Sequence, residues 1–284
     1  MEKIAVVTDT GSNLSFAQAK ELGIYLLPLQ ITIDETTYQD TLEISTQDIY
    51  NELANGKMPK TSMAAYQKIY DLFEELKKDY DTIFAVPLTN GLSTNASTMQ
   101  SIARELEMNV HVIDMYATCA LEKHVAIWIK KLVDEHKSSE EILKIIQPAI
   151  DEPNSLILVK NLQHLKRGGR LTPMAAALAG LLKIYPVLHI NKSTEGRIDV
   201  LNKVRTEKRA DAYAIDKVMD DIDIQHTHIY IIHSNFLEGA DHFKKCFIEK
   251  GVPEQNIHID YISSVIAVHT GLGCIAIQYI REEN

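Results

Sequence analysis

Side chains that carry hydroxyl groups recur in this sequence at points where an apolar run gives way to a turn. Residues 8–13 and residues 89–95 each follow a short apolar run, and Thr61 and Ser62 precede a segment with helical spacing. In open α/β sheets, ligands bind outside the carboxyl ends of the strands. Neutral donors at helix starts suit an anion. The pattern therefore predicts a site for a small anionic group, and it offers no obvious nucleophile–base pair to attack that group.

Two pairs of hydroxyls are the main candidates for holding the anion. Thr61 and Ser62 stand before a helical pattern that we place at residues 64–80, and Ser93 and Thr94 stand at the start of another. Each pair taken alone is also typical of ordinary helix caps. Gly91 permits close backbone approach beside the second pair. We expect the two turns to converge on one anion.

Arg170 and His269 are the charged and titratable candidates. Arg170 follows a Gly-Gly turn, so it is either a surface residue beyond a helix C-cap or an arginine whose fork binds a carboxylate. His269 lies before the final strand in a segment with flanking glycines, which we expect to be a constrained loop. A lone histidine is more often structural than catalytic, and both roles stay open here.

Other chemistries have less support. His226, His228 and His233 have no carboxylate or cysteine at a recognisable ligand spacing, so we expect no metal site. The sequence contains no glycine-rich nucleotide motif and no nucleophile elbow. Asp9 and Asp114 each end an expected strand. They are candidates for acid–base work, although organising their own loops explains them as well.

Composition limits the class of partner. The 284 residues carry a formal net charge of −10, which argues against nucleic-acid binding and against general attraction to anionic lipid. The three cysteines are far apart and form no pair typical of zinc or disulfide sites. With no leader-like segment at the N-terminus, we expect a cytoplasmic protein.

The elements that must position these side chains favour an α/β fold with two domains. Residues 1–153 alternate strand and helix, which predicts a parallel sheet flanked by helices. Residues 154–284 include two strands joined by a polar hairpin loop at 191–196, which predicts a second α/β domain with a mixed sheet. We place a helix at 172–182 and propose that its small residues line or cover an apolar tunnel. A plain core helix explains the same pattern.

Taken in order, the motifs resemble the DegV family of bacterial fatty-acid-binding proteins. The resemblance spans nearly the whole chain. The matching segments are residues 7–10, 59–62, 91–93, 112–114, 162–170, 203–206 and 269–271.

The resemblance implies a function. A long-chain fatty acid such as palmitate, stearate or oleate would lie buried in a tunnel, with its carboxylate held by Thr61 and Ser93 and with Arg170 and His269 nearby. The protein would not catalyse by itself and would need no cofactor. It would present the acid to a separate dihydroxyacetone-kinase-like, ATP-dependent fatty-acid kinase that makes acyl phosphate for phospholipid synthesis. Arg205 corresponds to the residue that contacts this kinase. We expect a monomer, and the reading allows transient contact with a membrane.

Our own reasoning adds Ser62 and Thr94 to the carboxylate site, because both hydroxyls stand beside the matching residues. The chain departs from the family at Met63-Ala64, where Gln-Pro is usual, and at Thr94, where glycine is usual. Met115 also replaces a common serine. Two alternatives stay open at this stage. One is a hydrolase or transferase for a small anionic substrate that uses Asp9, Asp114 or His269. The other is a carrier of a different apolar anion, such as a retinoid or an isoprenoid.

Overall fold

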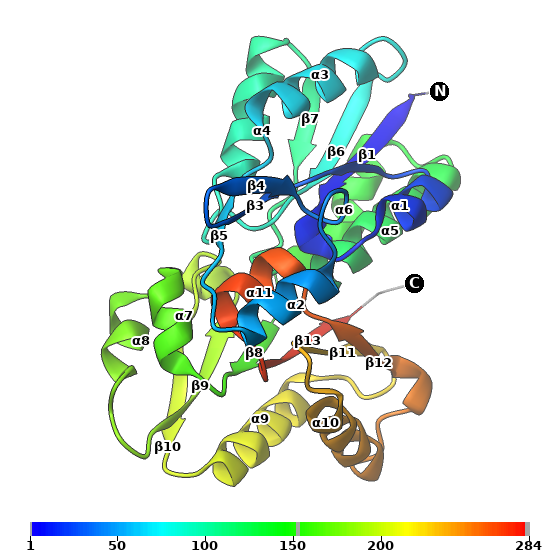
Figure 1. The fold of residues 1–284 in the computed structure, drawn as a ribbon. Helices are drawn as coiled ribbons and strands as arrows, with labels where there is room; N and C mark the ends of the chain where they lie inside the picture. The colour runs from blue at the N-terminus through cyan, green and yellow to red at the C-terminus, as the bar shows by residue number, and fades with distance from the viewer. Residues whose placement is uncertain (1, 152–153, 282–284) are drawn as a thin grey trace.

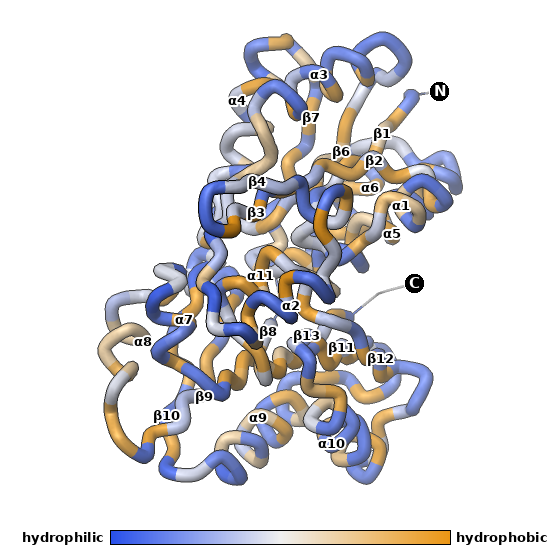
Figure 2. The backbone as a smooth tube through the Cα atoms, in the orientation of Figure 1, coloured by the Kyte–Doolittle hydropathy of each residue, from blue (hydrophilic) through white to orange (hydrophobic). Residues whose placement is uncertain are grey.

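The computed structural model describes residues 2–151 and 154–281, which form an α/β fold with two main sheets (Figure 1). The expectation of an α/β fold that combines a parallel and a mixed sheet is confirmed. Hydrophobic residues gather along the strands, whereas many of the outer turns are hydrophilic (Figure 2). Among the described residues, no helix is both long and apolar enough to cross a bilayer.

The first main sheet is parallel throughout and has the order β2-β1-β6-β7. Every residue of β1 and β6 is buried, as expected for central parallel strands covered on both faces. α5 and α6 pack on one face, and α3 and α4 pack on the other. The bounds are β1 (Ile4–Asp9), β2 (Tyr25–Leu27), β6 (Thr82–Val86), β7 (Asn109–Val112), α3 (Tyr66–Leu76), α4 (Asn95–Glu105), α5 (Ala120–Asp134) and α6 (Ser139–Asp151).

Two short helices of this half begin at serines that the sequence marks clearly. Ser15 caps α1 (Phe16–Leu22) and Ser45 caps α2 (Thr46–Ala54), each in a reciprocal capping box with the third helical residue. The 3-10 turn η1 (Thr10–Ser12) follows β1. These caps fix where the helices start, independently of tertiary packing.

A small antiparallel sheet of order β4-β3-β5 corrects one prediction. It comprises β3 (Gln30–Ile33), β4 (Thr36–Gln39) and β5 (Lys60–Ser62). Thr61 and Ser62 therefore lie in a strand that pairs with β3, not at a helix start. The following helix α3 begins only at Tyr66, and its N-cap residue Ala65 makes no side-chain capping bond. The alternative interpretation of Thr61 and Ser62 as ordinary helix caps is therefore wrong, because their backbone pairs with β3.

The second main sheet is mixed and has the order β10-β9-β8-β13-β11-β12. Helices α9 and α10 cover one face, and the other face is turned toward α2, α7, α8 and α11. The strands are β8 (Asn154–Leu158), β9 (Tyr185–Ile190), β10 (Asp199–Val204), β11 (Thr227–His233), β12 (Ile257–Tyr261) and β13 (Ile275–Arg281). The remaining elements are α7 (Leu162–Gly168), α8 (Pro173–Leu178), η2 (Lys192–Thr194), α9 (Glu207–Asp221), α10 (Leu237–Glu249), η3 (Glu254–Asn256) and α11 (Ser264–Thr270).

Two further predictions need correction in this half. The helix placed at 172–182 ends at Leu178, and Leu181 and Leu182 beyond it are 52% and 91% exposed. The segment expected to be a loop around His269 belongs instead to the short helix α11. α11 is rich in β-branched residues, which are poor helix formers, so its packing against α2 and α7 stabilises it.

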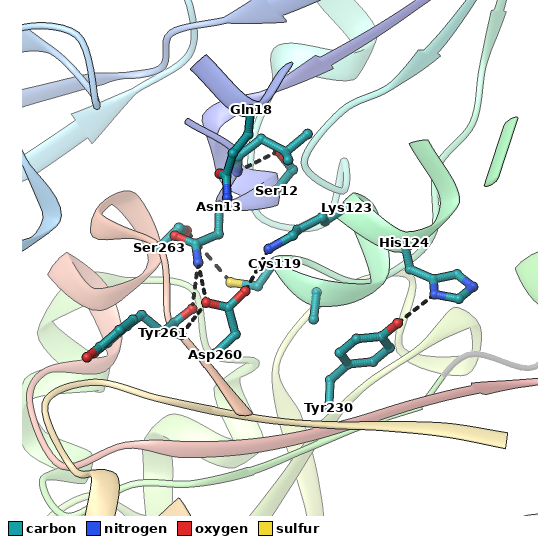
Figure 3. A network of polar contacts seen from close by, with 12 residues as sticks. Ser12, Asn13, Gln18, Cys119, Lys123, His124, Tyr230, Asp260, Tyr261 and Ser263 are labelled. Atoms are coloured by element: carbon teal, nitrogen blue, oxygen red, sulfur yellow. Dashed lines mark hydrogen bonds and ion pairs between the residues drawn. The ribbon is translucent and has the colours of Figure 1, made fainter. Parts of the chain in front are cut away.

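Contacts between the two halves run along the middle of the molecule, where α2 and α11 lie side by side (Figure 1). Beside them, Asn13 donates to the Asp260 carboxylate at 3.1 Å, and Lys123 forms an ion pair with the same residue at 2.7 Å (Figure 3). His124 and Tyr230 form a hydrogen bond of 2.7 Å. The predicted domain boundary between 153 and 154 adjoins residues 152–153, which lie outside the described residues. The division into domains therefore stays a prediction.

Candidate functional site

A cavity of about 460 Å³ lies between loops of the two halves. It brings together all six side chains proposed from the sequence, which are Thr61, Ser62, Ser93, Thr94, Arg170 and His269. Its lining, as far as the structure describes it, contains two arginines and no aspartate or glutamate. In a chain with a formal net charge of −10, this cavity is locally cationic and suits an anion.

The loop that carries Ser93 is held by two carboxylates. The backbone N–H of Leu88 donates to Asp9 at 3.0 Å, and the Asn95 amide donates to the same carboxylate at 2.6 Å. The N–H of Asn90 donates to Asp114 at 3.0 Å. Asp9 is fully buried, and neither aspartate lines the cavity. Both carboxylates thus organise loops, and the geometry gives no support to their alternative role as acid–base groups.

A close backbone contact fixes the same loop against the second half. A Cβ atom added to Gly91 would lie 2.2 Å from the carbonyl of Gly196, and one added to Gly196 would lie 2.1 Å from Thr89 Oγ1. Only glycine allows this approach. The contact places the turn before Arg197 directly beside the Ser93 loop.

Thr61 and His269 form a hydrogen bond whose direction follows from a third group. His269 Nδ1 lies 3.1 Å from the carbonyl oxygen of Gly168, which can only accept, so Nδ1 carries the hydrogen. His269 Nε2 must then accept from the Thr61 hydroxyl at 2.6 Å. Burial lowers the pKa of His269 to about 4, and the charge of Arg170 acts in the same direction. The imidazole is therefore neutral near pH 7.

Arg170 follows a helix C-cap and also lines the cavity. Gly169 ends α7 in the left-handed conformation with a φ of 75°, as a C-cap glycine does. The next residue turns its side chain to the cavity, where Arg170 Nη1 donates to the Gly168 carbonyl at 2.9 Å. Since no described carboxylate pairs with this guanidinium, its charge is available to a ligand.

The hydroxyls of the cavity differ in what they can still donate. Ser62 donates to Gln30 at 3.0 Å, and Thr94 donates to the sulfur of Met63 at 3.4 Å. Within the part of the chain that the structure describes, Ser93 Oγ accepts from the N–H of Asn95 at 3.2 Å and donates to no group, so its own hydrogen is free for a ligand. Met63 and Thr94, both departures from the family pattern, thus contact each other.

A second, narrow cavity of about 30 Å³ continues inward between the mixed sheet and α11. It shares Leu92, Ile198, Ile266 and Thr270 with the outer cavity, and its remaining wall is mainly apolar. At its polar end, Gln278 donates to the carbonyl of Thr118 at 3.0 Å and to Ser155 at 2.9 Å. The remaining wall residues are Ile157, Ile190, Ile232, Ile262, Cys274 and Ala276. Residues 174–182, proposed from the sequence to line an apolar tunnel, do not appear among the lining of either cavity.

Sequence reasoning missed Arg197, the second arginine of the outer cavity. It is exposed at the rim and follows the polar loop 191–196, where no motif marks it. Gly196, the buried residue before it, was the one feature that could have indicated the position of Arg197 at the cavity. For metals, the described ranges contain no cluster of three or more histidine, cysteine or acidic side chains placed to hold an ion.

The fold and the cavities define an α/β protein with a cationic pocket between its two halves and a narrow apolar extension beside the mixed sheet. The family model described as an uncharacterised protein of the DegV family matches residues 3–282, so the chain belongs to the DegV family. A DegV domain-containing protein of Halalkalibacterium halodurans is 31% identical over 289 residues, covering 100% of both chains.

Two solved structures share the fold closely. A structure described as a fatty acid binding DegV family protein from Streptococcus agalactiae has a TM-score of 0.91 and 29% identity, with 100% of both chains covered. A structure described as DegV, a fatty acid binding protein from Bacillus subtilis, has a TM-score of 0.86 and 26% identity. That alignment covers 99% of this chain and 100% of the other.

Proposed function

We propose that this protein binds a long-chain fatty acid, with the carboxylate in the outer cavity and the hydrocarbon tail in the inner one. The observation that carries the proposal is the continuity of the two spaces. Polar and cationic side chains line the outer space, and the shared residues Leu92, Ile198 and Ile266 lead into an apolar interior. The fatty acid binding described for the two solved relatives supports the same assignment.

Burial of the tail supplies most of the affinity. Fifteen methylenes at about 0.8 kcal/mol each give a gross gain near 12 kcal/mol, which association costs reduce. A space of about 30 Å³ holds roughly one or two water molecules. The side chains of Leu92, Ile198 and Ile266 must therefore move apart to admit the tail. Apolar walls without fixed hydrogen bonds permit that movement.

The carboxylate needs partners, because an unpaired buried charge is costly. Ser93 offers a free hydroxyl hydrogen, and Arg170 offers an unneutralised guanidinium. Thr61 can join them only by turning its hydroxyl away from His269 Nε2. Ser62 and Thr94 complete the polar rim, each with its hydroxyl already bonded within the protein.

The proposal includes presentation of the carboxylate to a separate ATP-dependent fatty-acid kinase that forms acyl phosphate. Arg205 follows β10 and is exposed, as are Lys203, Lys208 and Arg209 around it. This basic group on an acidic protein supports docking of a partner there. The protein itself would act as a cytoplasmic, monomeric binding protein without catalysis of its own. The exposed Leu181 and Leu182 support transient contact with a membrane.

Native mass spectrometry of the protein purified from bacterial cytoplasm tests the binding. We expect a bound fatty acid in the wild type. Replacing both Thr61 and Ser93 by alanine removes two polar groups that face the carboxylate, at about 1.5 kcal/mol or more each, so retention should weaken on the order of a hundredfold. The matched control replaces Thr37 and Ser97, which are exposed hydroxyl residues on nearby elements.

Three outcomes would contradict the proposal. Unchanged acid content in the Thr61→Ala, Ser93→Ala double variant would show that these two hydroxyls do not hold the carboxylate. A retinoid or isoprenoid in place of the fatty acid would favour the alternative carrier. Turnover of small anionic substrates without any partner protein would favour the alternative hydrolase or transferase.

A further inference from the structure

A second large cavity, of about 520 Å³, lies on the opposite face of the mixed sheet and shares no lining residue with the fatty-acid site. It opens where β8 ends, where β9 and β13 begin and where α9 and α10 start, beneath the sheet in Figure 1. The volume falls in the usual range for small-molecule pockets.

One part of the wall of this second large cavity is apolar. The side chains of Pro186, Ala210, Phe243 and Ile275 are buried and line it. Part of this surface remains uncovered at the cavity, so an apolar molecular body would gain free energy by lying against it.

Three carboxylates also line the cavity, and they differ in their partners and in their position on the helices. Glu207 forms an ion pair with Lys160. Glu238 lies in the first turn of α10, where it complements the positive end of that helix. Asp211 lies one turn into α9, is partly buried, and has no hydrogen bond or ion pair within the described structure. Burial raises the pKa of Asp211, while His242 and Lys160 act in the opposite direction.

The cavity already contains one example of ammonium recognition. Lys160 Nζ lies 4.9 Å from the centre of the Phe236 ring while it pairs with Glu207. An aromatic face and a carboxylate together are a favourable environment for an ammonium group. Neither Asp211 nor Glu238 has such a cation within the described residues, and of the two only Asp211 is partly buried, because Glu238 is exposed.

We propose that this cavity binds a small organic cation, with its ammonium group beside Asp211 and its apolar body against Phe243 and Ile275. A second fatty acid does not fit, since an anion would meet Asp211 and the acidic first turns of both helices. A neutral apolar molecule would take Asp211 further from water without pairing it. The exposed cations Arg205, Lys208 and Arg209 lie outside the lining and do not cancel the local negative charge.

The test compares three ligands of one shape on the intact protein with its bound lipid. The probes are 2-phenylethylammonium, the neutral 2-phenylethanol and the anionic 3-phenylpropanoate, titrated by protein-observed NMR and calorimetry. We expect saturable binding of the ammonium at residues 207–211 and 236–243. The alcohol should bind at least tenfold more weakly, and the carboxylate should not bind in this cavity.

Variants test whether the Asp211 carboxylate itself, and not a general effect of substitution, determines binding of the ammonium. Asp211→Asn should weaken ammonium binding at least tenfold, whereas Asp220→Asn, an exposed position on the same helix, should leave it unchanged. Ala210→Leu fills the apolar floor and should abolish binding in a protein that still retains its fatty acid. Equal affinity for the alcohol, full binding to Asp211→Asn or Ala210→Leu, or no saturable binding of any probe would each overturn the proposal.

Discussion

Replacing Asp40 by asparagine should change how the stability of this protein depends on pH. Asp40 is fully buried at the end of β4 and accepts a hydrogen bond from Ser264, the first residue of α11. It therefore joins the first half of the chain to the helix that carries His269. Burial raises the pKa of Asp40 from its ordinary 3.8 to about 6, against the hydroxyls of Ser264 and Thr10.

The direction in which pH changes the stability follows from the raised pKa of Asp40. The unfolded chain loses the proton near pH 4 and the folded chain near pH 6, so the fold disfavours the ionised carboxyl. Asp40 thus lowers the free energy of unfolding above pH 6, and the loss disappears as the pH falls below 4. A shift of roughly two units corresponds to about 3 kcal/mol in full. Between pH 7 and pH 4.5 the change is about 2 kcal/mol.

Asparagine stays neutral over this range and retains an oxygen that accepts from Ser264. Urea unfolding can be followed by the fluorescence of Trp128, the only tryptophan in the sequence, which is 6% exposed. The free energy of unfolding of the wild type should rise by about 2 kcal/mol relative to Asp40→Asn as the pH falls from 7 to 4.5. The exposed substitution Asp79→Asn should follow the wild type. Parallel pH curves for the wild type and Asp40→Asn would refute the reasoning.

Two further substitutions test the proposed route of the fatty acid. Arg205→Glu should leave acid content unchanged but slow phosphorylation by the proposed fatty-acid kinase roughly tenfold, because it reverses an exposed charge of the proposed docking surface. Lys68→Glu on α3 should have no effect. A normal rate with Arg205→Glu would show that Arg205 is not a docking residue. Gln278→Leu should shift the bound acids toward longer chains and cost about 1–3 kcal/mol of stability, because the Thr118 carbonyl loses its donor at the inner end of the cavity. An unchanged acid profile by mass spectrometry would show that Gln278 does not limit chain length.

Local signals predicted much of the fold. The capping boxes at Ser15 and Ser45 join residues three positions apart, so a local window of the sequence contains both partners of each. The apolar strands β1 and β6 and the alternation of strand and helix likewise predicted the parallel sheet. In the site, the six expected side chains meet at one cavity because loops from both halves converge there. Their roles as ligands to a carboxylate stay a prediction.

Features that depend on distant partners were not predicted. Thr61 and Ser62 look like helix caps locally, but pairing with β3 makes them a strand. α11 has a composition that favours strands, and its helical form depends on packing against two other helices. No sequence motif predicts Arg197 as a site residue. Its position at the cavity depends on the contact of Gly196 with the Ser93 loop. In each case the deciding interaction lies outside the local window of the sequence.

The approach of Gly91 to Gly196 makes the outer pocket a joint property of two remote stretches of chain. Neither stretch alone encloses the space, since Ser93 comes from one and Arg197 from the other. If the polypeptide were cut between its two sheets, the outer cavity would last only while the fragments stayed associated. Their separation would dismantle the pocket and open its inner extension to water in a single event.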